Sequence, residues 1–178
     1  CGRTRRGARN SVRFIGYRGI VTVQDCDVLI VGGGPAGLSV ASHLAADIKC
    51  IIVHQDAKIG QPVRTSGGSF LADMKALKIP AEYYQIIDKL DVFSDTAQAS
   101  INIESDKMVV LDITKLYQYL ASLSDKSSRQ ILLASKFMSA VKQSDGRYIS
   151  EIRNREIGQK FIRSKYIIDA SGWHCAVL

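Results

Sequence analysis

One segment sets the architecture of this chain: residues 26–37, Cys26-Asp27-Val28-Leu29-Ile30-Val31-Gly32-Gly33-Gly34-Pro35-Ala36-Gly37. Its first half is a short apolar run rich in β-forming residues, and the glycines follow at once. Residues 38–46 are mostly small or helix-forming, and residues 49–54 form a second apolar run of strand length. The order strand, glycine turn, helix, strand predicts a right-handed βαβ unit with parallel strands.

The glycine spacing Gly32-x-Gly34-x-x-Gly37 in this context is typical of dinucleotide-binding sites. Gly32 permits a tight turn, Gly34 lets a pyrophosphate approach the backbone, and Gly37 lets the helix pack closely on the strand. The N-terminus of the helix that follows has free N–H groups and a positive dipole end, which attract phosphate. The alternative is a glycine turn that binds no ligand.

A ribose-binding acid is expected at the end of the second strand. That position holds Gln55, and Asp56 follows it. A glutamine can hydrogen-bond ribose hydroxyls without charge assistance. Asp56 is the substitute if the strand ends one residue later.

The regular alternation of strands and helices stops after this unit. Residues 56–69 read as a loop, and residues 70–90 as short helices broken at Pro80. Residues 99–111 predict two strands joined by a turn at 105–106, and a helix capped by Asp112 or Thr114 follows them to about residue 122.

The last third of the chain is rich in strand signals. Asp145-Gly146 between two alternating runs predicts a hairpin, and a second turn is expected near Gly158. Residues 165–172 predict a buried strand that enters a tight turn. The chain is therefore α/β with a β-rich portion, and it shows no internal repeat.

Composition and charge limit the function classes. The chain has 178 residues, 46% of them hydrophobic and 23% charged, which is typical of a globular protein. No run reaches the roughly 18 apolar residues of a membrane span, so no integral membrane segment is expected. The four cysteines and three histidines show no metal-ligand spacing, so no metal site is predicted. Cys26 and Cys50 flank apolar runs and are expected to be buried.

Most of the net charge of +7 comes from the N-terminus. Residues 1–20 hold six of the 24 basic residues and no acidic residue. The rest of the chain holds the other 18 basic residues and 17 acidic residues, which nearly balance. We expect residues 1–20 to be a basic tail without fixed structure. A targeting segment and a basic arm for anionic surfaces are the alternatives, and nucleic-acid binding would rest on this tail alone. The default location is cytoplasmic, with organelle import through the tail as an alternative.

Four segments together resemble the flavoprotein oxidoreductases of the p-hydroxybenzoate hydroxylase and geranylgeranyl reductase type. The first is the glycine segment, which looks like the FAD-binding opening of that superfamily. The others are Arg64-Thr65-Ser66-Gly67-Gly68-Ser69, residues 111–121, and Ile167-Ile168-Asp169-Ala170-Ser171-Gly172. The resemblance runs from about residue 25 to the end and matches the N-terminal portion of such proteins.

The resemblance implies a cofactor-binding role for particular residues. The three motif glycines, with Pro35 and Ala36, would hold the pyrophosphate of FAD, and Gln55 would stand where the family has its ribose acid. Arg64 and residues 66–69 would lie near the ribityl chain or flavin ring. Residues 169–172 would approach the adenosine half of FAD. The full set of expected cofactor contacts is Gly32, Gly34, Pro35, Ala36, Gly37, Gln55, Asp56, Arg64, Ser66, Gly67, Gly68, Asp169 and Gly172.

The fold implied is a Rossmann-like FAD/NAD(P)-binding domain that is interrupted by the start of a β-rich substrate domain. Residues 21–70 and 112–178 would form an incomplete FAD-binding domain, and residues 71–111 the start of a substrate-side insertion. The implied function is flavin-dependent hydride transfer to an unsaturated small-molecule substrate such as an isoprenoid, with NAD(P)H as a candidate electron donor. A flavin monooxygenase, a cyclase without net redox change and a non-catalytic dinucleotide-binding fragment are the alternatives. No residue stands out as a catalytic acid or base, and the oligomeric state is not predicted.

Overall fold

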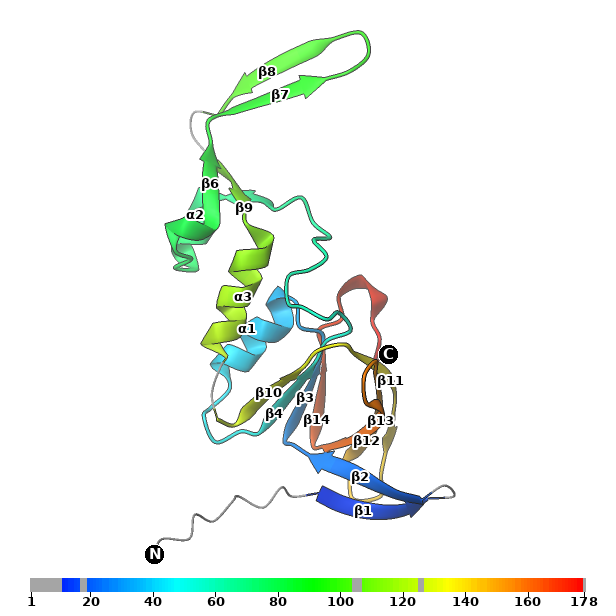
Figure 1. Cartoon of the computed structure of the whole chain (residues 1–178). Helices are drawn as coiled ribbons and strands as arrows, with labels where there is room; N and C mark the ends of the chain where they lie inside the picture. Colours follow the sequence, from blue (N-terminus) through cyan, green and yellow to red (C-terminus); the bar gives the residue numbers. More distant parts are fainter. Residues whose placement is uncertain (1–10, 17–18, 104–106, 125–126, 178) are drawn as a thin grey trace, which may run out of the picture. The chain divides into compact units, whose positions relative to one another are not determined.

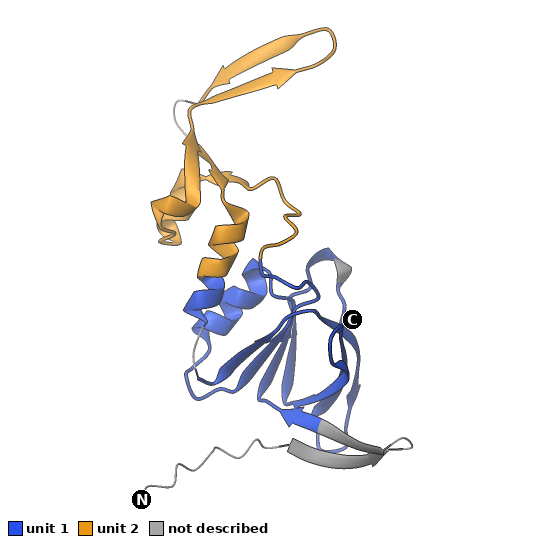
Figure 2. Ribbon diagram, in the orientation of Figure 1, with its two compact units in different colours: residues 1–59, 120–178 blue, residues 60–119 orange. Residues whose placement is uncertain are grey.

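The computed structural model describes residues 11–16, 19–103, 107–124 and 127–177 (Figure 1). The chain divides into two compact units (Figure 2). Unit 1 comprises residues 1–59 and 120–178, and unit 2 comprises residues 60–119. The predicted insertion, residues 71–111, lies wholly within unit 2.

Unit 1 is built on a four-stranded parallel sheet in the order β10-β4-β3-β14. Helix α1 (Pro35–His43) connects the two central strands. These observations confirm the predicted βαβ unit. The strands are β3 (Val28–Val31), β4 (Cys50–Val53), β10 (Arg129–Leu132) and β14 (Tyr166–Asp169).

A five-stranded sheet in the order β1-β2-β13-β12-β11 completes unit 1. Its neighbours are antiparallel, except that β2 and β13 run parallel. The predicted hairpin is present: β11 and β12 pair antiparallel, and Gly146 in the turn between them has φ +81°. The strands are β1 (Ser11–Gly16), β2 (Gly19–Asp25), β11 (Ser135–Lys142), β12 (Tyr148–Asn154) and β13 (Gly158–Ser164).

The core of unit 1 lies on both faces of the parallel sheet. On one face, Leu29 and Ile51 join a cluster with Ile152 and Ile162 of the antiparallel sheet. On the other face, Ile30 lies against the start of α1. Every residue of β3 and β4 is buried, which explains why their sequences are continuous apolar runs rather than alternating ones. Cys26 and Cys50 are buried as expected.

Unit 2 contains a three-stranded sheet in the order β5-β9-β6 and a separate hairpin of β7 and β8. Helix α3 begins in unit 2, and the side chain of Asp112 caps it by accepting a hydrogen bond from the N–H of Lys115 at 3.1 Å. The elements are β5 (Gly68–Phe70), α2 (Leu71–Ala76), η1 (Ala81–Tyr83), β6 (Tyr84–Ile87), β7 (Lys89–Phe93), β8 (Gln98–Asn102), β9 (Met108–Leu111) and α3 (Ile113–Leu123).

The prediction of one strand pair over residues 99–111 was wrong. Both strands exist, but β8 pairs with β7, and β9 lies between β5 and β6. Residues 70–90 were predicted as short helices, but residues 84–87 belong to strand β6 and residues 89–90 open strand β7. The pairing of β9 with β5 and β6 joins distant segments and overrides the local pattern, whereas β7 and β8 form a local hairpin.

Two further segments differ from the sequence-based expectation. Within residues 1–20, Ser11–Gly16 and the start of β2 form a hairpin, while residues 1–10 and 17–18 lie outside the described part of the chain. Apolar and polar residues alternate over 11–14 and again over 21–24, a pattern that the arginine count obscured. Strand β14 is half exposed rather than buried, with Tyr166 66% exposed, because it is the last strand of the parallel sheet.

Among the described residues, no helix combines the length and apolar character that crossing a bilayer requires.

Candidate dinucleotide site

The loop between β3 and α1 is fixed by two glycines that the packing requires. Gly32 has φ +115°, and a Cβ at this position would overlap the carbonyl group of Ala170. A Cβ at Gly37 would overlap the carbonyl oxygen of Gly32 and lie 3.1 Å from Cγ2 of Ile30. The predicted tight turn and close helix packing are therefore both present.

Gly34 differs from these two, because a Cβ at Gly34 would meet no atom within 4 Å. Its φ of −84° is open to any residue, so neither packing nor backbone conformation requires glycine there. The space beside Gly34 is open on the outer side of the loop. A ligand that approaches the backbone closely would account for a glycine at this position.

The N-terminus of α1 presents free donors beside that space. The first helical hydrogen bond runs from the N–H of Leu38 to the oxygen of Gly34 at 3.0 Å. Pro35 has no N–H, and the N–H groups of Ala36 and Gly37 have no partner within the helix. No side chain caps the helix, and its first turn holds no acidic residue. This end of α1 therefore fits the diphosphate of a dinucleotide.

The end of β4 places two polar side chains in different surroundings. Gln55 is exposed, whereas Asp56 is only 9% exposed. The Asp56 carboxylate lies 3.6 Å from Nε2 of His54, and Nδ1 of His54 accepts a hydrogen bond from the N–H of Gly33 at 3.2 Å. Asp56 is thus turned toward His54, and Gln55 keeps the exposed position at the strand end.

His54 was not among the predicted site residues. The signal that points to it is its place at the carboxyl end of β4, because the carboxyl ends of parallel strands face the ligand crevice in folds of this type. In the sequence, His54 directly follows the apolar run 50–53, which by itself indicates only a strand end.

The predicted turn after β14 lies against the glycine loop. The N–H of Ala170 donates to the oxygen of Val31 at 2.9 Å. The Asp169 carboxylate accepts hydrogen bonds from Ser171 N, Ser171 Oγ and Val177 N at 3.0, 2.6 and 3.0 Å. Burial acts to raise the pKa of Asp169, but these hydrogen bonds outweigh it and lower the pKa below its ordinary value. The carboxylate therefore holds its own turn together, and Gly172 continues it with φ +79°.

The predicted second loop belongs to unit 2. Arg64 and Ser66 are exposed, and Gly67 is buried with φ +75°. The carbonyl oxygen of Gly67 accepts a hydrogen bond from Leu111 N at 2.9 Å, and Gly68 then opens β5. This loop is therefore anchored to β9 within its own unit.

The described residues contain no group of three His, Cys, Asp or Glu side chains placed to hold a metal ion. The donors that the site offers are mainly backbone N–H groups and neutral side chains. Such donors can hold and orient a phosphate-bearing ligand, whose own groups would then supply the reactive chemistry.

Comparisons with known proteins give a consistent result. The sequence model of a family described as FAD dependent oxidoreductase matches residues 27–174. A digeranylgeranylglycerophospholipid reductase of Thermoplasma acidophilum is 27% identical over 157 residues, which cover 83% of this chain and 39% of the relative. A digeranylgeranylglycerophospholipid reductase of Methanothermobacter thermautotrophicus is 26% identical, with 86% of this chain and 40% of the relative covered. The chain thus spans about two fifths of the length of the curated relatives it matches.

Solved structures share the fold. A geranylgeranyl bacteriochlorophyll reductase-like protein from Thermoplasma acidophilum superposes with a TM-score of 0.69 at 23% identity, covering 85% of this chain and 40% of that protein. A p-nitrophenol 4-monooxygenase from Pseudomonas putida gives a TM-score of 0.65 at 14% identity, covering 84% of this chain and 42% of that protein. At these identities the likeness establishes the Rossmann-like fold.

Proposed function

The chain belongs to the FAD dependent oxidoreductase family, and from this premise we propose that it forms the FAD-binding portion of a flavin-dependent reductase. FAD is the cofactor of this family, and when bound it supplies hydride transfer to a carbon–carbon double bond. The substrate that we propose is an unsaturated isoprenoid chain, and the electron donor is NAD(P)H. The relatives named digeranylgeranylglycerophospholipid reductase support this substrate class.

One observation carries the proposal: the uncapped N-terminus of α1 follows Gly34, a glycine that neither protein packing nor backbone conformation requires. Backbone N–H groups at this helix end would hold the FAD diphosphate, with Gly34 allowing its approach. Gln55, exposed at the end of β4, would contact the adenosine ribose. Arg64, Ser66, Gly67 and Gly68 would form the second contact, toward the ribityl chain or the flavin ring.

Gln55 stands where an acidic, ribose-binding residue is expected, and this difference has a chemical consequence. The amide of Gln55 can donate as well as accept hydrogen bonds, but it carries no charge. Its hydrogen bond to a ribose hydroxyl is weaker than that of a carboxylate. We therefore expect Gln55→Glu to tighten FAD binding, because the new carboxylate would be exposed in the free protein and pays little desolvation.

The first experiment is a visible absorption spectrum of protein purified from the complete reading frame, with this chain alone alongside. The proposal expects the absorption bands of an oxidised flavin in the longer protein. A colourless, folded protein that also rejects added FAD would overturn it and would favour a non-catalytic fragment.

Substrate class needs a second, anaerobic experiment. The flavin-loaded protein is reduced with NADPH or NADH and then mixed with an isoprenoid lipid or with its fully saturated analogue. Reoxidation by the unsaturated lipid alone supports a reductase. If the lipid leaves the flavin reduced, and oxygen admitted afterwards with an aromatic additive reoxidises it and hydroxylates the additive, the protein is a monooxygenase instead.

A further inference from the structure

The inference concerns His54, whose side chain contacts the glycine loop. Nδ1 of His54 accepts a hydrogen bond from the N–H of Gly33 at 3.2 Å, and Nε2 lies 3.6 Å from the Asp56 carboxylate. The side chains of His54 and Asp56 are only 14% and 12% exposed. The contact is therefore shielded from water and joins the end of β4 to the loop that precedes α1.

The backbone of His54 is held from two sides, which fixes where its ring lies. Its N–H donates to the oxygen of Leu132 at 2.9 Å, and its oxygen accepts from the N–H of Ser135 at 2.8 Å. A Cβ at Gly33 would lie 2.9 Å from Cγ of His54 and 2.9 Å from Cδ1 of Ile59. The ring thus packs on the face of Gly33, where any larger residue would displace it.

The hydrogen bond requires one protonation state of the ring. Nδ1 can accept a hydrogen bond from the Gly33 N–H only if Nδ1 itself carries no proton, so the proton of the neutral imidazole resides on Nε2. Nε2–H then faces the negative charge of Asp56, which favours this tautomer. At 3.6 Å this is an electrostatic attraction rather than a direct hydrogen bond.

The hydrogen bond acts on the peptide group that sets the loop. The N–H of Gly33 and the carbonyl of Gly32 belong to one planar trans peptide unit, so they point in opposite directions. The carbonyl oxygen of Gly32 lies against Gly37, and the N–H is held by His54. Both ends of the peptide are therefore fixed immediately before Gly34, where the loop opens to the outside.

We propose that His54 is a positioning residue of the cofactor loop, with Asp56 fixing its tautomer. Nδ1 keeps the Gly33 N–H turned inward, and this leaves the donors of Gly34, Ala36 and Gly37 directed toward the ligand. Asp56 acts on the ring of His54 and not on the ligand. The residue that we propose for the ribose contact is Gln55. The effect on FAD binding rests on the proposed function, whereas the state of the ring and the Gly33 hydrogen bond do not.

The test uses two variants that separate the two ring nitrogens. In His54→Asn the amide oxygen can take the place of Nδ1, and in His54→Gln the side chain reaches toward Asp56 but leaves Gly33 without that acceptor. We expect His54→Asn to preserve slow hydrogen exchange at the Gly33 amide and FAD affinity close to that of wild type. We expect His54→Gln to abolish the protection and to weaken FAD binding up to about tenfold, as loss of one shielded hydrogen bond allows.

Nitrogen-15 NMR of wild-type His54 provides the ligand-free measurement, which stands even if a variant fails to fold. The expected spectrum is that of the neutral Nε2–H tautomer at neutral pH. A proton on Nδ1 would overturn the proposal, and so would equal Gly33 protection and equal FAD affinity in both variants. If wild-type protein bound no FAD, the proposed function would fail while the tautomer and the Gly33 protection could still hold.

Discussion

Both units of this chain contain strands with apolar, β-forming residues, but these residues are buried in unit 1 and exposed in the hairpin of unit 2. Every residue of β3 and β4 in unit 1 is buried, whereas every residue of β7 and β8 in unit 2 is exposed. One face of the hairpin carries Leu90, Val92 and Ile101, which are 42%, 49% and 52% exposed. Apolar β-forming sequence therefore produces a core only where other layers cover it, and we expect substitutions in β3 to cost more stability than substitutions in the hairpin.

The largest expected effect compares one leucine from each unit. Leu29→Ala empties a fully buried position in β3 and should lower the free energy of unfolding by about 3 kcal/mol. Leu90→Ala in β7 should lower it by less than about 1 kcal/mol, because the side chain is already partly hydrated. Urea unfolding of both variants measures the difference. Equal losses would mean that the hairpin is packed in solution.

One glycine from each unit gives a second comparison of the cost of a substitution. Gly37→Ala forces a methyl group onto the carbonyl oxygen of Gly32 and should cost about 2–3 kcal/mol. Gly67→Ala in unit 2 meets the oxygen of Leu111 at 3.0 Å with φ +75°, and we expect a loss of about 1–2 kcal/mol from the left-handed conformation. Thermal unfolding ranks the two. A harmless Gly37→Ala would contradict the close packing of α1 on β3.

A smaller effect is expected from an acidic residue in each unit. Asp27 accepts the N–H of Lys49 at 2.9 Å and pairs with Nζ of Lys165 at 2.7 Å. The hydrogen bonds from Lys165 and then Lys49 lower the pKa of Asp27 below its ordinary value of 3.8. Its stabilisation is therefore present above pH 3.8 and is lost as the pH falls through the lowered pKa.

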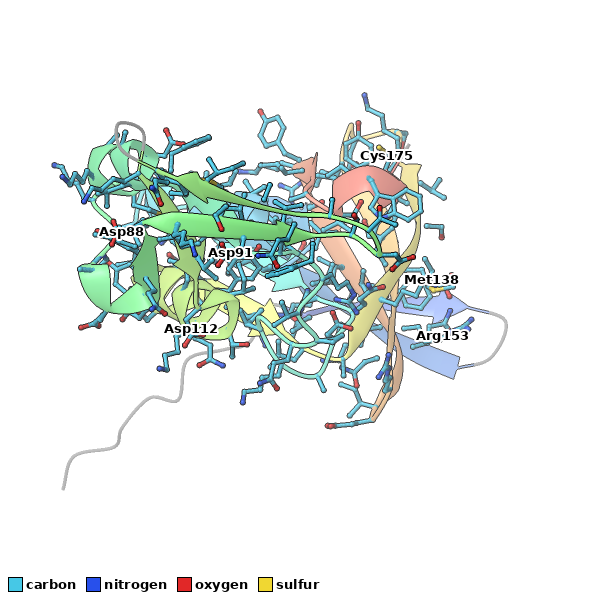
Figure 3. All side chains as sticks on the ribbon, turned by 90° about the horizontal axis from the view of Figure 1, so that it is seen from above. Asp88, Asp91, Asp112, Met138, Arg153 and Cys175 are labelled. Atoms are coloured by element: carbon cyan, nitrogen blue, oxygen red, sulfur yellow. The ribbon has the colours of Figure 1, made fainter. Side chains whose placement is uncertain are left out.

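Asp27→Asn should thus lower stability by no more than about 1 kcal/mol at neutral pH, with a smaller difference from wild type in acid. Asp91 is the matched control on the exposed hairpin, where Ser100 and then Lys89 lower its pKa (Figure 3). Asp91→Asn should leave the global unfolding transition in place across the same pH series. The reverse order of the two variants would place the stabilising contacts in unit 2.

The smallest effect is a chemical modification that leaves the fold unchanged and tests whether a reagent reaches the core of unit 1. Burial raises the pKa of Cys26 to about 12 and that of Cys50 to about 11. Cys175 is exposed near the C-terminus (Figure 3). Iodoacetamide at pH 8 should therefore modify Cys175 and spare the two buried thiols until denaturant is added, as peptide mapping by mass spectrometry would record. Rapid modification of Cys26 in the native chain would show that the core opens.

Local signals in the sequence predicted the parts of the fold that local interactions fix. The glycine spacing and two apolar runs predicted β3, α1 and β4, and Asp145-Gly146 predicted the hairpin of β11 and β12. Asp112 was predicted as a helix cap because its side chain acts within one turn. Each of these signals lies within a few residues of the structure it specifies.

Pairing between distant segments could not be predicted in the same way. Nothing in residues 99–111 reveals that β9 lies between β5 and β6, because that arrangement depends on strands far away in the chain. The contact of His54 with Gly33 has the same origin, since 21 residues separate them and only the parallel pairing of β3 and β4 brings them together. The cofactor roles of all the predicted site residues stay predictions.

The most direct test of the central claim compares FAD binding by wild-type protein and by Gly34→Ala, expressed from the complete reading frame. Because a Cβ at Gly34 touches no protein atom, the free energy of unfolding should stay within about 0.5 kcal/mol of wild type. The methyl group would occupy the space where we place the diphosphate, so FAD affinity should fall by about tenfold or more. Unchanged affinity with unchanged stability would contradict the assignment of this loop as the cofactor site.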